Sequence, residues 1–249
     1  MKHRSFLILL LCLFLLLGCS IGTEPKTSPN EIATTKITAA PTEAPKTEES
    51  ISTEKGEIAS PESEQQANDT PEPVRTDSLV VYFSRTGEQY NVGVIDEGNT
   101  AIVAKMIAEE TGADLYEILP LEDYYPYTYR ELTDVAKKEQ NENARPAIQN
   151  EVPDLSGYQT IYIGAPVWWG DWPMILYTFF EENAEALKGK TLIPFSTHEG
   201  SGLSGFDKKL AKACPDSTIG KGLAIAGRDA QNDRDRVRQK VRDWLKDLG

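Results

Sequence analysis

The stretch Val80-Val81-Tyr82-Phe83-Ser84-Arg85-Thr86-Gly87, completed after an interruption by Gly98-Asn99-Thr100, decides how the rest of the chain is interpreted. Strand-forming residues run into a Ser/Thr/Gly turn, and apolar residues recur at helical spacing after Asn99. A turn between a strand and a helix directs hydroxyl and free backbone N–H groups to one point, where the helix dipole also favours negative charge. The stretch is therefore typical of a phosphate site, and equally of an ordinary capped turn.

The N-terminus indicates export. Lys2, His3 and Arg4 precede an apolar run at residues 6–17, which is short for a membrane span and typical of a secretory signal. The run ends in Leu-Leu-Gly-Cys at residues 16–19, which resembles the lipobox of bacterial lipoproteins. The resemblance implies that residues 1–18 are a lipoprotein signal peptide, and that Cys19 carries palmitate and anchors the protein to the outer side of the cell membrane. An uncleaved helical anchor is the alternative, and it would place the bulk of the protein on the same side of the membrane.

The segment that follows is expected to be disordered. Residues 20–77 contain no aromatic residue and are rich in Pro, Thr, Glu, Ser and Ala. Such a composition cannot bury enough apolar surface to offset the entropy of ordering. We therefore predict that residues 19–77 form the lipidated Cys19 and a flexible tether.

Composition narrows the chemistry of the mature chain. Cleavage at Cys19 leaves Cys214 as the free thiol and His198 as the histidine, so we expect no internal disulfide and no metal site. Residues 78–249 hold 27 acidic and 19 basic side chains. This acidic balance argues against nucleic acid and anionic lipid as partners, and it leaves a basic protein, a small cofactor, or simply a surface that keeps the protein dispersed. Which redox protein or small electron acceptor is the partner stays open.

Strand and helix patterns alternate through residues 78–249, which predicts a single α/β domain. After the first strand, further strands are expected at 114–119, 160–165, 191–197 and 222–226. Helices are expected to begin at Asn99 and to cover 174–187, part of 203–214 and the C-terminal end. Two insertions depart from short loops: residues 88–98, and residues 121–154 with four tyrosines and a helical middle at 130–141.

Three polar or aromatic loops follow the first, third and fourth strands. They are the first loop, quoted above, Pro166-Val167-Trp168-Trp169-Gly170-Asp171, and Thr197-His198-Glu199-Gly200-Ser201-Gly202. Since the carboxyl ends of parallel strands lie at one edge of a sheet, these loops are expected to converge there. A flat ring that carries a phosphate needs such a convergence.

These loops carry a specific resemblance. The domain resembles the flavodoxin-like family, especially its branch with Ser-Arg-Thr-Gly-Glu, a short insertion and Gly-Asn-Thr. Ala-Pro-Val-Trp-Trp-Gly and Thr-His-Glu-Gly-Ser-Gly-Leu resemble that branch as well. The resemblance implies a five-stranded parallel sheet of order 2-1-3-4-5 with helices on both faces, and FMN as the cofactor. In this family the first loop holds the FMN phosphate, and the other two loops flank the isoalloxazine ring.

The resemblance also implies individual cofactor-binding residues. In the first loop these are Ser84, Thr86, Gly87, Asn99 and Thr100. In the second they are Pro166, Val167, Trp168, Trp169 and Gly170, and in the third they are Thr197, His198, Glu199, Gly200 and Gly202. No catalytic residue and no metal ligand is implied.

Several residues near these loops keep two interpretations. Arg85 is either a phosphate ligand or, as we slightly favour, a solvated loop residue. At least one of Trp168 and Trp169 is expected to be core. Asp171 and Glu199 either disfavour an anionic reduced flavin or serve as caps and solvated acids, the latter being favoured for Asp171.

The remaining open residues are a histidine and the tyrosine cluster. His198 either bonds the flavin, where it can pass a proton, or bonds a backbone carbonyl. The tyrosines at residues 124–129 either cover the site or, as we favour, pack an inserted helix. Because the first loop is split, Tyr90 or Asn91 can also enter the phosphate site.

Three functions are consistent with these patterns. The first is a membrane-tethered, extracytoplasmic FMN protein that transfers electrons between partners. The second is an FMN-dependent reductase of quinones or similar small acceptors. The third is a flavin-free binding module, because FMN must be acquired outside the membrane by a chain exported unfolded. Whether the protein is an enzyme stays open.

Overall fold

The computed structural model describes residues 76–249. The predicted signal peptide, Cys19 and almost all of the tether lie outside the described residues, so they remain predictions. No helix within residues 76–249 is long and apolar enough to cross a membrane.

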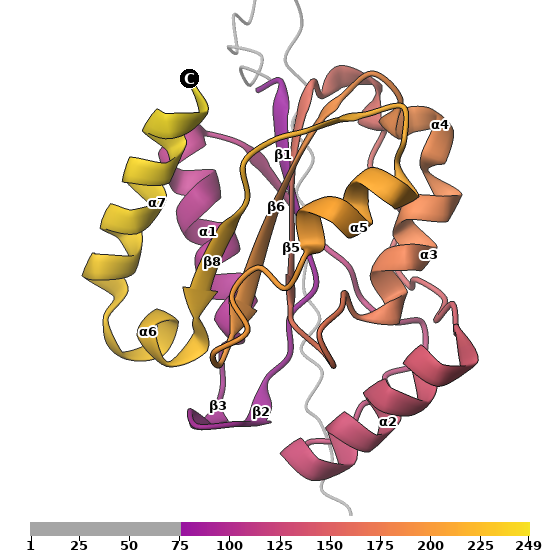
Figure 1. Cartoon of the computed structure of the whole chain (residues 1–249), viewed down its shortest axis with the longest axis vertical. Coiled ribbons are helices and arrows are strands. Elements are labelled where there is room, and N and C mark those ends of the chain that lie inside the picture. Colours follow the sequence, from indigo (N-terminus) through magenta and orange to yellow (C-terminus); the bar gives the residue numbers. More distant parts are fainter. Residues whose placement is uncertain (1–75) are drawn as a thin grey trace, which may run out of the picture. The chain divides into compact units, whose positions relative to one another are not determined.

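A parallel sheet forms the centre of the domain (Figure 1). Its strands are β1 (Ser78–Tyr82), β4 (Asp114–Glu117), β5 (Thr160–Pro166), β6 (Thr191–His198), β7 (Thr218–Ile219) and β8 (Leu223–Ala226). They lie in the order β4-β1-β5-β6, with β7 and β8 both beside β6. The register places Val80 beside Leu115 on one side and beside Tyr162 on the other. The predicted order 2-1-3-4-5 is confirmed.

The fifth position of the sheet differs from the prediction of one strand. β7 pairs with the first two residues of β6, and β8 pairs with its last four. The residues between them include Gly220 and Gly222, and a Cβ on Gly222 would lie 3.0 Å from the Pro194 carbonyl oxygen. A glycine is therefore needed where the chain passes this close to β6, between the two edge strands.

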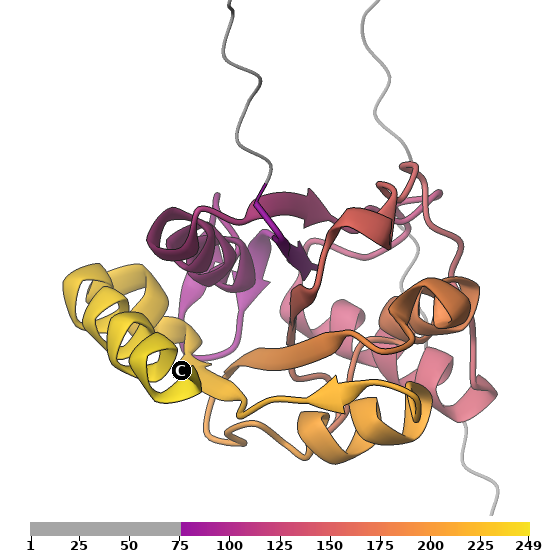
Figure 2. The same cartoon turned by 90° about the horizontal axis from the view of Figure 1, so that it is seen from above.

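Helices cover both faces of the sheet, as Figure 2 shows from above. On one face lie α1 (Asn99–Thr111), α6 (Gly227–Asn232) and α7 (Arg234–Leu248). On the other lie α3 (Met174–Glu182), α4 (Ala184–Leu187) and α5 (Phe206–Ala213). A short 3-10 helix, η1 (Leu155–Gly157), precedes β5.

The expected helix at 174–187 is broken between α3 and α4. Asn183 lies at the break, and its side-chain Nδ2 donates a hydrogen bond to the Phe179 carbonyl at 2.8 Å. An asparagine that bonds the preceding turn competes with continued helix formation. This competition explains why the predicted continuous helix is divided at Asn183.

Successive side chains of β1 point to opposite faces of the sheet and contribute to the core on both faces. Leu79 and Val81 face the cluster under α3 and α5, whereas Val80 and Tyr82 face the cluster under α1 and α7. All four are at most 5% exposed. A strand buried on both faces is what a sheet with helices on both sides requires.

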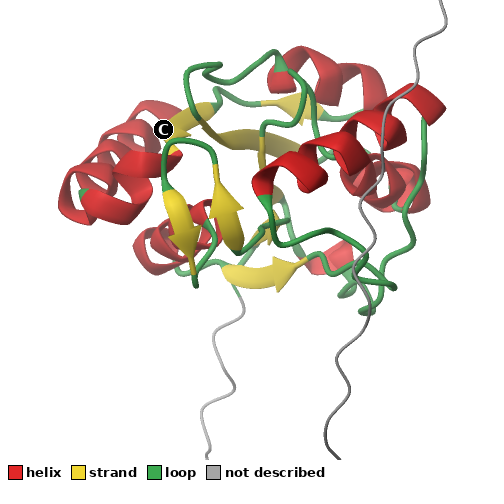
Figure 3. Ribbon diagram, turned by 90° about the horizontal axis from the view of Figure 1, so that it is seen from below, coloured by secondary structure: helices red, strands yellow, loops and turns green. Residues whose placement is uncertain are grey.

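The two insertions have defined structure. The insertion at residues 88–98 forms most of a hairpin, whose two strands are β2 (Gly87–Gln89) and β3 (Gly93–Ile95). The predicted helix in the second insertion is confirmed as α2 (Tyr129–Glu142). Figure 3, seen from below, shows the hairpin and α2 side by side near the carboxyl edge of the sheet.

Candidate functional site

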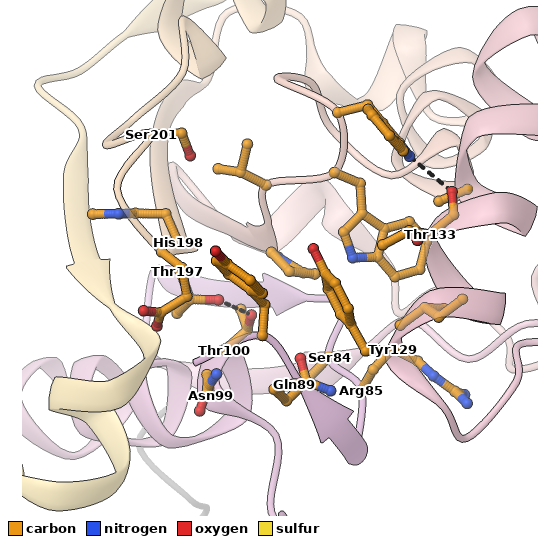
Figure 4. A pocket seen from close by; sticks show the side chains of 18 residues that line it. Ser84, Arg85, Gln89, Asn99, Thr100, Tyr129, Thr133, Thr197, His198 and Ser201 are labelled. Atoms are coloured by element: carbon orange, nitrogen blue, oxygen red, sulfur yellow. Dashed lines mark hydrogen bonds between the residues drawn. The ribbon is translucent and has the colours of Figure 1, made fainter. Parts of the chain in front are cut away.

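A cavity of about 460 Å³ lies at the carboxyl edge of the sheet. Its lining comes from the loops after β1, β5 and β6, from the start of α1, from the hairpin and from α2 (Figure 4). Ten of the fifteen predicted cofactor-binding residues line it. The other five do not: Thr86, Gly87, Gly170, Gly200 and Gly202.

The two halves of the first loop meet in space. Ser84 Oγ accepts a hydrogen bond from the Ala101 backbone N–H at 3.0 Å. Gly98 packs so closely that a Cβ on it would overlap Ser84 Oγ and would lie 2.7 Å from the Arg85 carbonyl oxygen. The hairpin therefore leaves and rejoins the turn without separating its halves.

This turn presents free donors to the cavity. Among the hydrogen bonds of residues 76–249, none uses the backbone N–H of Asn99 or Thr100, the first two residues of α1. Ser84 Oγ is an acceptor towards Ala101, so its own hydrogen is available to a ligand. Free N–H and O–H donors at a helix N-terminus suit a phosphate group.

Other first-loop residues act differently from the prediction. Thr86 is exposed, and its carbonyl accepts from Gln89 Nε2 at 3.3 Å. Gly87 has φ +89°, and a Cβ on it would lie 2.7 Å from the Tyr127 carbonyl oxygen, so glycine is needed to start the hairpin. The Thr100 hydroxyl lies 2.7 Å from the Thr197 hydroxyl, and this buried pair joins α1 to β6.

Arg85 corrects the favoured interpretation of a solvated residue. Its side chain is 15% exposed and forms an ion pair of 2.7 Å with Asp123. Nη2 donates to the Tyr125 carbonyl at 2.9 Å, and the guanidinium lies 5.3 Å from the centre of the Tyr125 ring. Nε is buried and has no hydrogen-bond partner among residues 76–249. Arg85 thus borders the cavity with its guanidinium fixed on Asp123 and Tyr125.

The loop after β5 forms a tight turn. Trp168 and Asp171 exchange backbone hydrogen bonds of 3.0 and 2.9 Å. Trp169 and Gly170 between them have φ of +50° and +74°, the pattern of a type I′ turn. The Gly170 carbonyl points to Lys209 Nζ, which donates a hydrogen bond to it. Gly170 therefore shapes the turn, although it does not line the cavity.

The two tryptophans of this turn differ in burial, and both line the cavity. Trp168 is partly buried and packs edge-on against Phe83 and Tyr125 at 5.4 and 5.3 Å, so it lies against the core and also borders the cavity, whereas the prediction made one of the pair simply core. Trp169 is 53% exposed. Its Nε1 donates to the Thr133 carbonyl at 2.8 Å, and Lys137 Nζ lies 5.2 Å from its ring centre. These contacts hold the turn against α2.

The acidic side chains near the ring loops have structural roles. Asp171 Oδ1 accepts from the Trp172 backbone N–H at 2.7 Å and from the Tyr177 hydroxyl at 2.9 Å, so it holds the turn before α3 and is neither the N-cap of that helix nor a solvated acid. Glu199 Oε1 accepts from the Arg228 backbone N–H at 2.9 Å in the first turn of α6. Both carboxylates are therefore fixed by the fold.

His198 does not bond a carbonyl. Its Nδ1 accepts from the Gly200 backbone N–H at 3.0 Å, which places the ring proton on Nε2 in the neutral form. Burial lowers the pKa of His198 below its ordinary value. Figure 4 shows its imidazole directed away from the middle of the cavity, where Asp229 and Lys240 act on it electrostatically. The third loop contributes Ser201 to the lining in place of Gly200 and Gly202.

The sequence interpretation missed most of one wall. Gln89, Leu132, Thr133, Ala136 and Ser201 line the cavity without having been predicted. The α2 members follow Tyr129 at helical spacing, a signal of one lining face that was present in the sequence. The tyrosine cluster serves both expected roles, since Tyr125 is buried whereas Tyr129 lines the cavity.

The comparisons with known proteins agree with this geometry. Residues 78–247 match the family model described as flavodoxin. A solved candidate flavoprotein from Bacteroides uniformis ATCC 8492 is 32% identical with a TM-score of 0.53, and the match covers 68% of this chain and 99% of that one. Another from Bacteroides eggerthii DSM 20697 is 31% identical with a TM-score of 0.53, and covers 69% and 96%. No curated protein matches the chain. The chain therefore belongs to the flavodoxin family and carries the fold of flavodoxin-like flavoproteins.

Proposed function

We propose that this chain binds FMN and transfers electrons on the outer side of the cell membrane, where lipid on Cys19 holds it. One observation carries the FMN part of the proposal. One cavity has phosphate-type donors at one end and the indole rings of Trp168 and Trp169 in its lining at another. A flat ring joined to a phosphate matches both ends at once.

The residues present fit FMN. The N–H groups of Asn99 and Thr100 and the Ser84 hydroxyl would hold the phosphate. Charge-assisted hydrogen bonds of this kind are the strong ones. The close packing of Gly98 brings these donors together, and the tryptophans would contact the isoalloxazine ring.

FMN supplies one- and two-electron chemistry when it is bound. The contribution of this chain is to bind and orient the cofactor and to exclude water from it. The histidine and carboxylate that line the cavity are already engaged, His198 by Gly200 and Glu199 by Arg228. This engagement supports an electron carrier rather than an enzyme with a dedicated acid or base.

The membrane part of the proposal is supported by the basic start, the apolar run and the Leu-Leu-Gly-Cys sequence at residues 16–19. We expect the full chain to incorporate a palmitate analogue in cells and the Cys19→Ala variant to incorporate none. Equal labelling of both proteins would contradict lipidation at Cys19.

The FMN part is tested by titrating residues 20–249 with FMN and recording the visible spectrum and the flavin fluorescence. We expect a shifted flavin band and quenched fluorescence at micromolar FMN. Absence of both would contradict FMN binding and favour a flavin-free binding module. Steady-state turnover of a quinone with a nicotinamide donor would favour a reductase over a carrier.

A further inference from the structure

The side chain of Asn99 is held at one end and free at the other. Its Oδ1 accepts a hydrogen bond of 2.9 Å from Nε2 of Gln231, a residue of α6. Among the hydrogen bonds of residues 76–249, none uses Asn99 Nδ2. Asn99 lines the cavity, and Figure 4 shows its amide nitrogen on the cavity side of the group and its oxygen on the far side. The amide therefore offers unused N–H donors to the cavity.

The orientation of this amide follows from hydrogen bonds that begin at a backbone carbonyl. Gln231 Nε2 also donates to the Glu97 carbonyl oxygen at 2.7 Å. A carbonyl oxygen can only accept, so the group of Gln231 that faces it must be the NH2 group. The same NH2 group faces Asn99, and the atom of Asn99 that it meets must be the oxygen. Gln231 therefore determines which end of the Asn99 amide faces the cavity.

The residue that orients Gln231 is itself fixed. The Glu97 carboxylate forms ion pairs with Lys105 Nζ at 2.7 Å and with Arg234 Nη2 at 2.9 Å. Lys105 belongs to α1 and Arg234 to α7, so Glu97 is tied to the two helices on either side of it. Its carbonyl oxygen is a fixed reference point for the Gln231 amide.

The start of α6 closes against the free end of the Asn99 amide. Gly227 lies four residues before Gln231, so both residues lie on the same face of α6. A Cβ on Gly227 would overlap Asn99 Nδ2, so glycine is needed for the amide to keep its place. Glu199 Oε1, which accepts from the Arg228 N–H, ties the same turn of α6 to the loop after β6. The amide is therefore confined by α6 along its length.

These contacts give the phosphate end of the cavity a support from outside it. Gln231 does not line the cavity, whereas Asn99 does. We propose that Gln231 is a positioning residue, which holds the Asn99 side chain so that its Nδ2–H groups donate to the phosphate of the ligand. The proposal rests on the proposed function, in which the start of α1 binds the FMN phosphate. With the amide reversed, Asn99 Oδ1 would face the phosphate, and an acceptor cannot bond a phosphate oxygen.

A double-mutant cycle tests whether Gln231 acts through Asn99. Residues 20–249 and the variants Gln231→Met, Asn99→Ala and the combination of the two are titrated with FMN and with riboflavin, followed by flavin fluorescence. We expect FMN binding to weaken about threefold in Gln231→Met and about tenfold in Asn99→Ala, with riboflavin unchanged in both. In the Asn99→Ala background, Gln231→Met should cost no further FMN affinity.

The matched control is Gln239→Met. It removes a glutamine whose Nε2 bonds Asp243 on α7 at 2.9 Å, outside the cavity. Neither FMN nor riboflavin affinity should change in this variant.

The side-chain amide signal of Asn99 provides a second readout, which a merely structural role of Gln231 would not move. In NMR spectra of the labelled protein, FMN should shift the Asn99 Nδ2–H2 signals strongly in wild type and weakly in Gln231→Met. Riboflavin should leave these signals nearly unchanged in both proteins.

Two results of the cycle would overturn the proposal. An FMN affinity unchanged by Gln231→Met would show that Gln231 positions nothing. An equal loss of FMN affinity with and without the Asn99 side chain would show that Gln231 only stiffens the fold. If the wild-type protein binds no flavin, or binds FMN and riboflavin equally well, the proposed function or its phosphate position is overturned instead.

Discussion

The two ends of the cavity are built in different ways. The end at Ser84, Gly98 and Thr100 consists of backbone and small side chains fixed between β1 and α1, and Thr100 is 1% exposed. The end at Trp169 and Tyr90 consists of large aromatic side chains on turns, each 53% exposed. The difference teaches that the first end is preorganised for one shape of anion, whereas the second can adapt to flat rings of several kinds.

The sharpest way to break the first end is Gly98→Ala. The added Cβ would overlap Ser84 Oγ and crowd the Arg85 carbonyl, so the loop halves must separate. We expect a loss of about 2 kcal/mol in the free energy of unfolding, measured by denaturant titration, and loss of detectable FMN binding. Gly157→Ala is the matched control, because a Cβ there meets nothing within 4 Å. An FMN affinity unchanged by Gly98→Ala would show that the two halves need not meet.

Ser84→Ala should distinguish the two ends of the cavity, because it should weaken the binding of FMN and not that of riboflavin. The substitution removes the cap of the Ala101 N–H and one phosphate donor. We expect about 1 kcal/mol lower stability and about tenfold weaker FMN binding. Riboflavin, which lacks the phosphate, should keep its affinity in fluorescence titrations. An equal loss for both ligands would place the phosphate elsewhere.

Trp169→Ala should weaken flavin binding at the aromatic end of the cavity, by less than Ser84→Ala weakens FMN binding. Loss of one exposed ring face corresponds to about 1 kcal/mol, or about fivefold in affinity. FMN and riboflavin should weaken equally in the same titrations, because the ring is common to both. Tyr127→Ala is the control, since its ring is exposed outside the cavity. A loss confined to FMN would contradict the position given to the ring.

His198 gives the smallest effect, through pH. Its pKa is lowered by burial, so the folded state binds fewer protons than the unfolded state, whose histidine pKa is about 6.5. This contribution to stability is present above about pH 6.5 and is lost as the pH falls towards the folded pKa. Denaturant unfolding at neutral and mildly acidic pH should show a smaller acid loss for His198→Asn than for wild type. An identical loss of stability in both proteins would show that His198 does not contribute to the pH dependence of folding.

The convergence of the three loops could be predicted from local strand and helix patterns, whereas the order of the strands was predicted from the family resemblance. The environment of Arg85 could not be predicted from the sequence, because its partner Asp123 lies 38 residues away in an insertion. The sequence offered Tyr90 and the tyrosine cluster separately as possible site residues, but the stacking of Tyr90 on Tyr129 could not be predicted, since a hairpin and a helix must meet to form it. The close approach of Gly222 to Pro194 and Leu203 is likewise a tertiary contact that no local pattern reports.

The central claim is that the start of α1 holds the FMN phosphate, and backbone amide NMR tests it most directly. In labelled residues 20–249, the account predicts that FMN shifts the amide signals of Asn99 and Thr100 strongly, because each N–H gains a charged acceptor. Riboflavin should shift signals of the Trp168–Trp169 loop while leaving those two amides nearly unchanged. FMN binding that moves the loop signals but leaves Asn99 and Thr100 in place would contradict the account.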